Sequence, residues 1–494
     1  MIKRNIIIYG IMLILLMASI LPRELNDLDE LWNYNFARNI YDGKLPYKDF
    51  NMLQMPLLPI ICGTILKIFG NELIVMRAIG IFLNATILFG VYKILEQLKI
   101  NKHYIYASLG VIYILYFNYF RIDYNFAVLL IILLSIYIEL KHLNKNNDIF
   151  ENYKTKEILL GILVGTSILF KQTTGIFLSI IFIFYKLLLV AKKQELKLVI
   201  PIICRRLVGV CIPIIILCIY LTLNNIWYEF LDYAIWGIKT FDNVILYNKL
   251  IKFNVLGILS ILVPITMLYM YFKVIIKKVN TEEQKNIFIL FVYSIASFIV
   301  IFPISGATHF LIGSMPTIIA IIYISWLRLK DIKISNKIKM IYKILSEYFI
   351  WVLVTCATCF IILHFMKYDS FSNKNHYKYI TSKLDDNITQ IDNYIIEQNN
   401  NGKKVYILDA VACLYMIPLD KYNKNYDMFL KGNLGAKGEI GQIENLEEEE
   451  DIVVLIMNDN YNRNWQNPEK VRKYIINNWN KKGEIEQFDI YEKE

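Results

Sequence analysis

The sequence predicts a mostly α-helical protein that crosses a membrane many times and ends in a small α/β domain. Of its 494 residues, 56% are hydrophobic and 19% are charged, and the mean hydropathy is +0.42. Eleven apolar windows have roughly the 20 residues that a membrane span needs. Residues 1–366 hold 36 Lys+Arg against 21 Asp+Glu, whereas residues 367–494 hold 17 against 22. We therefore expect a transmembrane domain over 1–366 and a soluble domain over 367–494.

The eleven windows also predict an orientation. The first follows Lys3 and Arg4 as in a signal peptide, but it has no A-x-A cleavage site, so we interpret it as an uncleaved anchor. With the N-terminus in the cytoplasm, the inner segments hold 25 Lys+Arg and the outer segments 11, as the positive-inside rule requires. An odd number of spans then places 367–494 outside the cell membrane. The windows are 5–21, 73–98, 104–119, 125–140, 157–170, 175–190, 207–223, 254–273, 286–303, 310–327 and 347–366.

The composition argues against two other classes of protein. The basic residues are divided among short loops and form no stripe with interleaved aromatic residues, so we expect no nucleic-acid partner. Six of the seven cysteines lie in apolar segments, so the chain has no disulfide framework. The partner that the composition predicts is membrane lipid.

Two outer segments are long enough to fold on the membrane surface and to roof a cavity. In 22–72, the spacing of Trp32, Phe36 and Ile40 predicts an amphipathic helix, and a short apolar helix follows over 56–69. The second segment, 224–253, is rich in the Trp and Tyr that favour a membrane interface.

The tail has the pattern of a small α/β module. Apolar residues from Ile380 to Ile395 predict a helix, "KKVYIL" and "DIVVLIM" predict buried strands, a helix starts at Pro468, and "IEQFDIY" predicts a closing strand. The stretch "GNLGAKG" lacks the Lys-Ser/Thr of a phosphate loop and predicts a turn. The run "EEEED" predicts a solvated loop.

Three carboxylates, Asp27, Asp29 and Glu30, are crowded together just after the first apolar window. Asp27 with Glu30 matches a helix capping box, which leaves Asp29 unexplained. At the outer end of a bundle, a carboxylate can also act as general base on an acceptor hydroxyl, or several can hold a divalent cation against a phosphate. No spacing in the chain spells out a metal-ligand set, so the sequence leaves metal dependence open and calls for no cofactor with certainty.

The residues around this cluster resemble a known family. "DLDELWNYNFARNIYDGKLPYKDF", then "QMPLL" and "FGNELIVMR", are similar in order to the first outer loop of glycosyltransferase family 39, the protein O-mannosyltransferase and aminoarabinose transferase relatives within the GT-C superfamily. That family has an acidic pair after the first span, a "G..PY.D" stretch, a "PPL"-like helix and "FG....R" entering the second span. The match covers about fifty residues. The many spans and the outer C-terminal domain extend the resemblance over most of the chain.

The resemblance implies a transferase that moves a sugar from a polyprenyl-phosphate carrier to an acceptor glycan, lipid or protein outside the membrane, usually with inversion. By position, Asp29 matches the catalytic acidic residue and Glu30 its acceptor-side or structural partner. The chain departs from the pattern at Gln54, where relatives with "KPPL" have a lysine that contacts the donor phosphate.

We expect Lys171 to supply the positive charge that the missing lysine at Gln54 would give. From Glu157 to Lys171 a helix extends about 22 Å, less than the roughly 30 Å of the hydrocarbon core, so Lys171 is expected below the outer surface. A cation there needs a wet cavity or an anion, and a lipid phosphate is the natural anion. Gln172 is expected to hydrogen-bond the phosphate or the sugar. The alternative is a lysine that snorkels from a short helix.

Arg77 and His309 are further substrate-binding candidates on the outer face. Arg77 matches a family position and is expected to pair with the phosphate or with an acid of the first loop, unless it is an interfacial anchor. His309 lies on an outer turn before a span, where a structural role is the alternative. Arg121 and Asp123 read as an exposed ion pair of little energetic weight.

Two rival functions remain open at this point. A flippase or transporter of lipid-linked sugars is expected to have ionisable groups near mid-bilayer or an inverted repeat, and the predicted spans are almost free of charge. A sensor or scaffold with an outer binding domain is expected to depend on 367–494 and not on Asp29.

Overall fold

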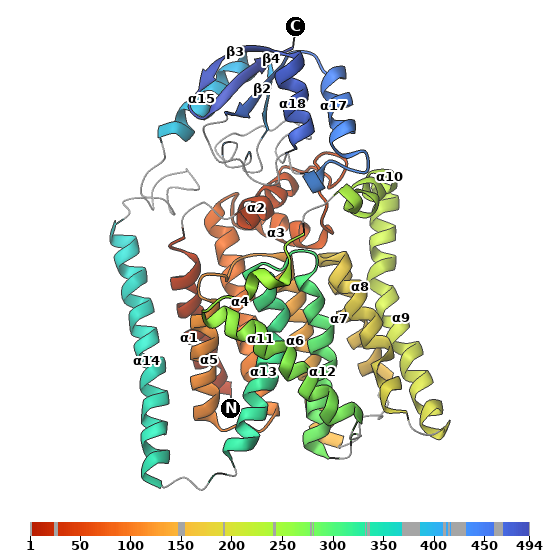
Figure 1. Ribbon diagram of the computed structural model, residues 1–494, viewed down its shortest axis with the longest axis vertical. Coiled ribbons are helices and arrows are strands. Elements are labelled where there is room, and N and C mark those ends of the chain that lie inside the picture. Colours follow the sequence, from red (N-terminus) through yellow and green to blue (C-terminus); the bar gives the residue numbers. More distant parts are fainter. Residues whose placement is uncertain are drawn as a thin grey trace. The chain divides into compact units, whose positions relative to one another are not determined.

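The computed structural model describes two compact units (Figure 1). The first comprises Met1–Ile20, Ile79–Ile219 and Asn243–Leu363, and the second Leu21–Ala78, Tyr220–Asp242 and His364–Glu494. The second unit therefore combines the tail with the first predicted outer segment and with the first part of the second, whereas residues from Asn243 onward belong to the first unit. The structure describes residues 2–23, 28–146, 154–190, 193–240, 244–276, 279, 281–330, 332, 336–367, 386–408, 412, 415, 431–458 and 468–493.

Long helices, most of them side by side, build the first unit (Figure 1). They are α1 (Ile2–Ile20), α4 (Leu73–Gln97), α5 (Lys102–Tyr116), α6 (Tyr124–Asn146), α7 (Lys154–Phe170), α8 (Gln172–Phe184), α9 (Lys193–Asn224), α11 (Val255–Tyr271), α12 (Glu282–Phe298), α13 (Ala307–Leu329) and α14 (Asn336–Lys367). The first residues of α4 and the last of α9 and α14 belong to the second unit.

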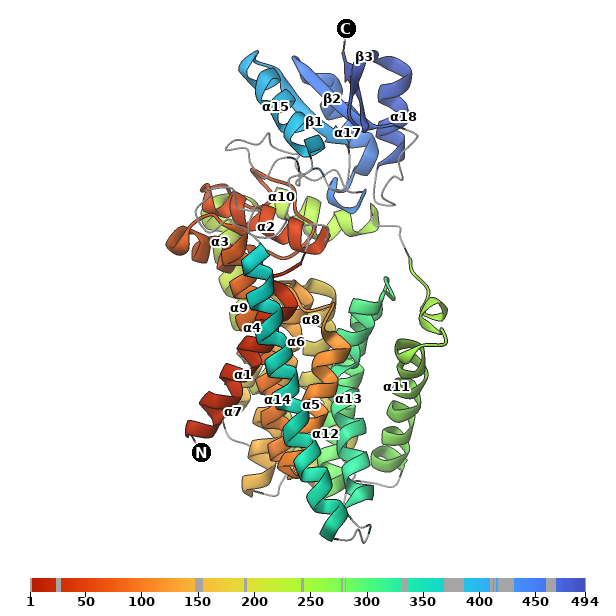
Figure 2. The ribbon, with the colours of Figure 1, turned by 90° about the vertical axis from the view of Figure 1, so that its left-hand side faces the viewer.

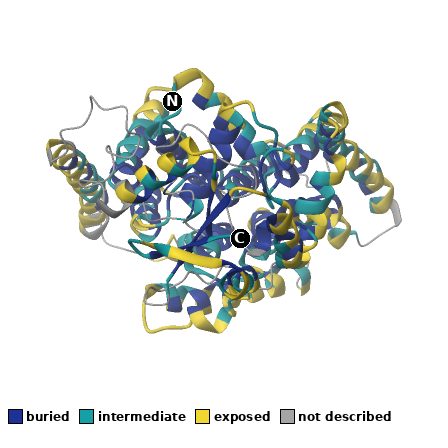
Figure 3. Cartoon of the chain, turned by 90° about the horizontal axis from the view of Figure 1, so that it is seen from above, coloured by how far each residue is buried: buried dark blue, intermediate teal, exposed yellow. Residues whose placement is uncertain are grey.

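These helices confirm a protein that crosses the membrane many times. In the described part of the chain, nine helices are long and apolar enough to span a bilayer. The two remaining predicted windows are helical as well, but α5 and α7 have only 15 and 17 residues, about 22 and 25 Å of helix. Large apolar side chains are exposed along many helices, as expected where lipid replaces water (Figure 3). The orientation of the termini stays a prediction.

The second unit contains a four-stranded mixed sheet. Its strand order is β1-β2-β4-β3, with β1 and β2 parallel and the other pairs antiparallel. The strands are β1 (Lys404–Leu408), β2 (Ile452–Met457), β3 (Asn480–Ile485) and β4 (Phe488–Glu492). The helices are α2 (Leu28–Tyr41), α3 (Leu57–Phe69), α10 (Trp227–Phe230), α15 (Asp386–Asn400), α17 (Gly438–Glu448) and α18 (Glu469–Asn478).

Helices cover both faces of this sheet (Figure 2). On one face, Val405 and Ile407 of β1 pack with Ile391 and Ile395 of α15. On the other, alternate strand residues pack against α17 and α18. Both faces of β2 are covered, so all six of its residues are buried. This central position explains why the sequence of β2 is a continuous apolar run, "IVVLIM".

The tail agrees only in part with the sequence prediction. β1, β2 and α18 are confirmed, and so is the part of the first helix within α15; Ile380 and Leu384 lie outside the described residues. "IEQFDIY" is wrong as a single strand, because Glu486 has φ +50° and turns β3 into β4. The first two residues of "EEEED" close the unpredicted helix α17.

The tail contacts the outer segments of its own unit through "GNLGAKG". The Asn433 side chain donates to the Asn51 carbonyl at 3.2 Å, and the Ala436 N–H donates to Asp232 Oδ1 at 3.1 Å. These contacts join parts of the chain that lie 204 and 382 residues apart. The predicted turn is therefore an internal docking segment.

A buried carboxyl makes the tail sensitive to pH. Asp392 of α15 is 6% exposed, and its Oδ1 has no hydrogen-bond partner among the residues that the structure describes. Burial raises the pKa of Asp392 to about 8. A raised folded-state pKa means that the folded chain holds the proton above pH 4, so stability falls as the pH rises from about 4 towards 8. We expect Asp392→Asn to stabilise the tail by about 1–3 kcal/mol at pH 8 and to flatten this dependence. Hydrogen exchange of the β1 and β2 peptides measures both, and unchanged exchange at pH 8 contradicts the prediction.

Candidate functional site

Asp29 and Glu30 lie in the first turn of α2, and Glu30 forms an ion pair with Arg77. Arg77 donates to both oxygens of Glu30, from Nε at 2.8 Å and from the second guanidinium nitrogen at 2.7 Å. Its remaining nitrogen donates to the carbonyls of Leu21 and Arg23. Arg77 is 0% and Glu30 2% exposed. This bidentate pair ties α2 to the start of α4, and it corresponds to the predicted pairing of Arg77 with an acid rather than with phosphate.

Asp29 has a different setting from its neighbour. It lies in the first turn of α2 and is half-buried, and its carbonyl accepts a 2.6 Å hydrogen bond from the Asn33 side chain. The helix is not amphipathic as predicted, because every residue from Glu30 to Asn39 is buried. Asp27 lies outside the described residues. Asp29 is thus a partly accessible carboxylate directly before the buried stretch of this helix from Glu30 to Asn39.

The "G..PY.D" stretch forms a tight turn after α2. Asp49 accepts from the backbone N–H of Leu45 at 2.7 Å, and Tyr47 adopts a left-handed φ of +70°. The Tyr47 hydroxyl donates to the Gln54 carbonyl at 2.8 Å, and its ring packs on Phe230 of the second outer segment. These bonds give the motif a structural role in shaping the loop between α2 and α3.

Lys171 occupies the tip of a helical hairpin. α7 ends at Phe170, α8 begins at Gln172, and Lys171 between them is extended, with φ −149° and ψ 112°. The turn is tight because Gly175 packs against the Ile168 backbone, where a Cβ atom would collide. Gln172 is buried and Lys171 is half-buried. The predicted lysine is therefore not part of a continuous helix but the single residue that joins two.

Polar groups from the start of α6 surround this lysine. Lys171 Nζ donates to Asn125 Oδ1 at 2.7 Å and lies 5.4 Å from the centre of the Tyr124 ring. Asp123 accepts from the Asn125 N–H at 2.5 Å and caps α6. Burial raises the pKa of Asp123, whereas the nearby Arg121 and Lys171 oppose the rise. Asp123 is 1% exposed, so the predicted exposed ion pair is wrong.

Two more basic groups complete the cluster. Arg121 donates to the Thr308 hydroxyl at 3.2 Å in the first turn of α13. His309 follows in the same turn and lies close enough to Arg121 and Lys171 to feel both charges. We call Arg121, Lys171 and His309, with Asp123, the basic cluster.

The basic cluster has the chemistry of an anion site. It gathers the N-terminal ends of α6, α8 and α13, where helix dipoles and free N–H groups favour negative charge. Among the described residues, Arg121 and Lys171 place two basic side chains beside the one acidic side chain of Asp123. A phosphate is the common biological anion that matches such an arrangement.

The predicted residues fall into different units. Lys171, Gln172 and His309 belong to the first unit, whereas Asp29, Glu30 and Arg77 belong to the second. Their convergence on one cavity stays a prediction. Within the described ranges no group of three or more His, Cys, Asp or Glu is placed to hold a metal ion. Asn125 and Tyr124 were missed because neutral residues give no signal in a charge pattern.

A second charged cluster was missed altogether. Arg206 of α9 donates to Glu157 of α7 at 2.6 Å and to Glu139 of α6 at 2.9 Å, and Tyr185 also donates to Glu139. Lys186 lies 3.4 Å from Glu157. We call these residues, with Lys156, the buried ion network. Glu139, Glu157 and Lys186 lie at or near the ends of predicted windows and Arg206 lies just outside one, so spans that are almost free of charge still hold a charged network near their ends.

Comparison with known proteins gives the fold. No family model matches the chain, and no curated protein matches it by sequence. The crystal structure of ArnT from Cupriavidus metallidurans is similar with a TM-score of 0.55 at 10% identity, over 98% of this chain and 97% of that chain. The chain has the GT-C fold. The oligosaccharyltransferase of Archaeoglobus fulgidus is similar in two crystal structures, its apo form with a TM-score of 0.52 at 10% identity over 92% of this chain and 69% of that one.

The complex of the same Archaeoglobus fulgidus enzyme with Zn and sulfate has a TM-score of 0.50 at 10% identity, over 91% of this chain and 68% of that one. At such low identity these likenesses concern the fold alone. They confirm the GT-C architecture expected from the sequence, whereas membership of family 39 stays a prediction.

Proposed function

We propose that the chain is a membrane glycosyltransferase that moves a sugar from a polyprenyl-phosphate-linked donor to an acceptor outside the cytoplasm, a protein, cell-wall polymer or lipid. The basic cluster carries this proposal, because Arg121 and Lys171 lie where three helix N-termini meet. The fold supports it, since one protein that shares the fold is an oligosaccharyltransferase.

In this reaction the bond between the sugar carbon and the donor phosphate oxygen breaks, and the phosphate leaves with the electron pair. Lys171 and Arg121 stabilise the charge that grows on this leaving group. Asp29 accepts the proton of the acceptor hydroxyl, whose oxygen forms the new bond to the sugar. Glu30 acts through Arg77, by fixing the first turn of α2. A divalent ion held between Asp29 and phosphate is an alternative to direct proton transfer.

The buried ion network favours a second candidate function, a flippase or transporter of lipid-linked sugars. Ionisable residues inside spans are typical of transporters, and Glu139, Lys186 and Arg206 lie in helices that are long enough to span. The two functions separate in detergent micelles, where a transferase still turns over but a flippase has no two compartments to connect. Sugar transfer by the purified protein in micelles supports the first candidate.

Lys171→Met tests the donor site. Losing a charge-assisted hydrogen bond costs about 1.5–3 kcal/mol, so we expect the Kd for polyprenyl phosphate to rise about tenfold to a hundredfold. Lys249→Met is the matched control, because Lys249 is an exposed lysine of the same unit. Binding of radiolabelled polyprenyl phosphate to the purified protein measures both. Equal Kd values for the two variants contradict the assignment.

A further inference from the structure

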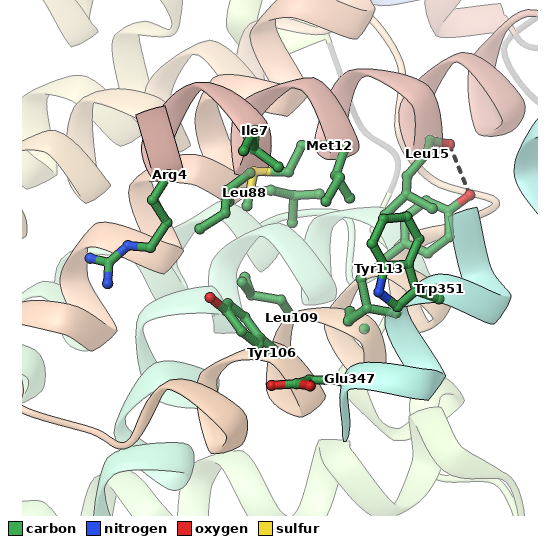
Figure 4. A pocket seen from close by; sticks show the side chains of 14 residues that line it. Arg4, Ile7, Met12, Leu15, Leu88, Tyr106, Leu109, Tyr113, Glu347 and Trp351 are labelled. Carbon is green, nitrogen blue, oxygen red and sulfur yellow. Dashed lines mark hydrogen bonds between the residues drawn. The ribbon is translucent and has the colours of Figure 1, made fainter. Parts of the chain in front are cut away.

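An elongated apolar cavity of about 370 Å³ lies between α1, α4, α5 and α14 in the first unit. This volume is within the range of about 300–1,000 Å³ that is typical of ligand sites. Figure 4 shows Ile7 and Met12 of α1 facing Leu109 of α5, with Trp351 of α14 beside them. The Tyr113 hydroxyl donates to the Leu15 carbonyl at 2.8 Å and links α1 to α5 next to these apolar side chains. α14 contributes little packing elsewhere, since only 11% of its spanning window is buried.

The cavity has a charged rim. Arg4 and Glu347 both line it, and Arg4 pairs with Glu96 at 2.5 Å. Glu347 lies 3.4 Å from His103 at the start of α5. The basic side chains around this rim are Arg4, Lys93, Lys102 and Lys343, against the two carboxylates of Glu96 and Glu347. These described side chains give the rim two positive charges in excess.

The rim lies at the opposite end of α5 from the basic cluster. His103 and Lys102 begin α5, whereas Arg121 and Asp123 follow its last residue, Tyr116. The 15 residues of α5 separate the two ends by about 22 Å. A lipid whose phosphate binds at this rim therefore comes from the other leaflet than a donor bound at the basic cluster, and in the predicted topology that is the inner leaflet.

We propose that this cavity is a binding site for one anionic glycerophospholipid, with an acyl chain between α1 and α5 and the headgroup phosphate at the rim. The apolar lining matches an acyl chain, and the charge excess matches a headgroup with a net negative charge. Arg4 is 47% exposed, so its guanidinium can contact the phosphate while it keeps Glu96 as a neighbour. The bound chain fills the space between α14 and the rest of the unit.

Native mass spectrometry of the full-length protein tests the site, with palmitoyl-oleoyl phosphatidylglycerol as the probe. Leu109→Trp fills the cavity from α5. Val111→Trp is the matched control, because it places the same side chain on the same helix at a residue that is 59% exposed. We expect wild type and Val111→Trp to keep one phosphatidylglycerol after detergent exchange. We expect Leu109→Trp to lose at least about nine-tenths of this occupancy, roughly the effect of 1.4 kcal/mol. If Leu109→Trp does not fold, Met12→Phe fills the same cavity from α1.

Arg4→Gln separates the headgroup from the acyl chain. We expect this variant to bind phosphatidylglycerol about tenfold more weakly than wild type and to lose less affinity for phosphatidylcholine, because the choline group already offsets the phosphate charge that Arg4 faces. Equal occupancy in both tryptophan variants, no retained lipid in wild type, or a retained mass that corresponds to polyprenyl phosphate would each overturn the proposal. Since the site rests on the first unit alone, these outcomes are independent of whether sugar transfer is detected.

Discussion

Replacing Asp29 with asparagine is expected to lower the kcat of sugar transfer by about 10²–10⁴-fold, the usual contribution of a general base. Asparagine has the same shape as aspartate but cannot accept the acceptor's proton. The fold is expected to persist, because Asp29 is half-buried in the first turn of α2 and the pairing that anchors this turn belongs to Glu30 and Arg77. The KM for the donor is expected to stay within about twofold, since phosphate contacts are assigned to Lys171 and Arg121.

Two companion variants give this experiment its controls. Asp42→Asn removes an exposed carboxylate just beyond the end of the same helix, and we expect wild-type kcat. Glu30→Gln leaves Asp29 in place but weakens the bidentate pair, so it is expected to lower thermal stability along with activity. Radiolabelled sugar transfer in micelles, with the melting temperature of each variant, separates the three. Full activity in Asp29→Asn would remove Asp29 from the mechanism.

The helices were predictable because their signal is local. A long run of apolar residues is helical in a bilayer, since the helix is the structure that satisfies all backbone hydrogen bonds within one segment. Length alone separates the two windows that fall short, since α5 and α7 have 15 and 17 residues. The depth and the role of Lys171 stay predictions, and its extended backbone between two helices depends on the packing of Gly175, which the sequence does not show.

The roles of Glu30 and Arg77 needed the structure. Both residues were visible as candidates, but their partner choice is a contact across 47 residues. For Arg77 the sequence left three roles open: pairing with phosphate, pairing with a loop acid, or anchoring at the interface. The fold shows that Arg77 donates four hydrogen bonds, two to Glu30 and two to backbone carbonyls. Partner choice over such distances is a tertiary property and leaves no trace in local spacing.

In the tail, the missed elements are the polar ones. β3, "NKKGEI", lies at one edge of the sheet, is largely exposed and has no apolar alternation, whereas β1 at the other edge is mostly buried. Lysines on an edge strand protect it from pairing with other chains, and they also hide it from a hydrophobic pattern. The central strand β2 is buried throughout, and its apolar run predicts it directly. Predictability here followed burial.

The buried ion network is expected to give the largest stability effect in the chain. Arg206 is 0% exposed and holds Glu139, Glu157 and the Phe182 carbonyl, so Arg206→Met leaves two buried carboxylates short of a partner. Breaking such a network from one side costs about 3–5 kcal/mol. α7 and α9 are closely packed beside the network, since a Cβ atom on Gly161 of α7 would approach the Arg206 carbonyl oxygen to 2.6 Å.

The pair of Lys330 and Glu283 provides the contrast that decides this prediction. Its N–O distance of 2.8 Å is similar, but its side chains are 39% and 52% exposed, so Lys330→Ala is expected to cost about 0–1 kcal/mol. Chemical denaturation in micelles compares the two variants. The double variant Glu157→Gln with Arg206→Met removes one stranded charge and is expected to recover part of the loss. If Arg206→Met were no less stable than Lys330→Ala, burial would not determine how much an ion pair contributes to the free energy of unfolding. The network would then be a better candidate for a role in transport.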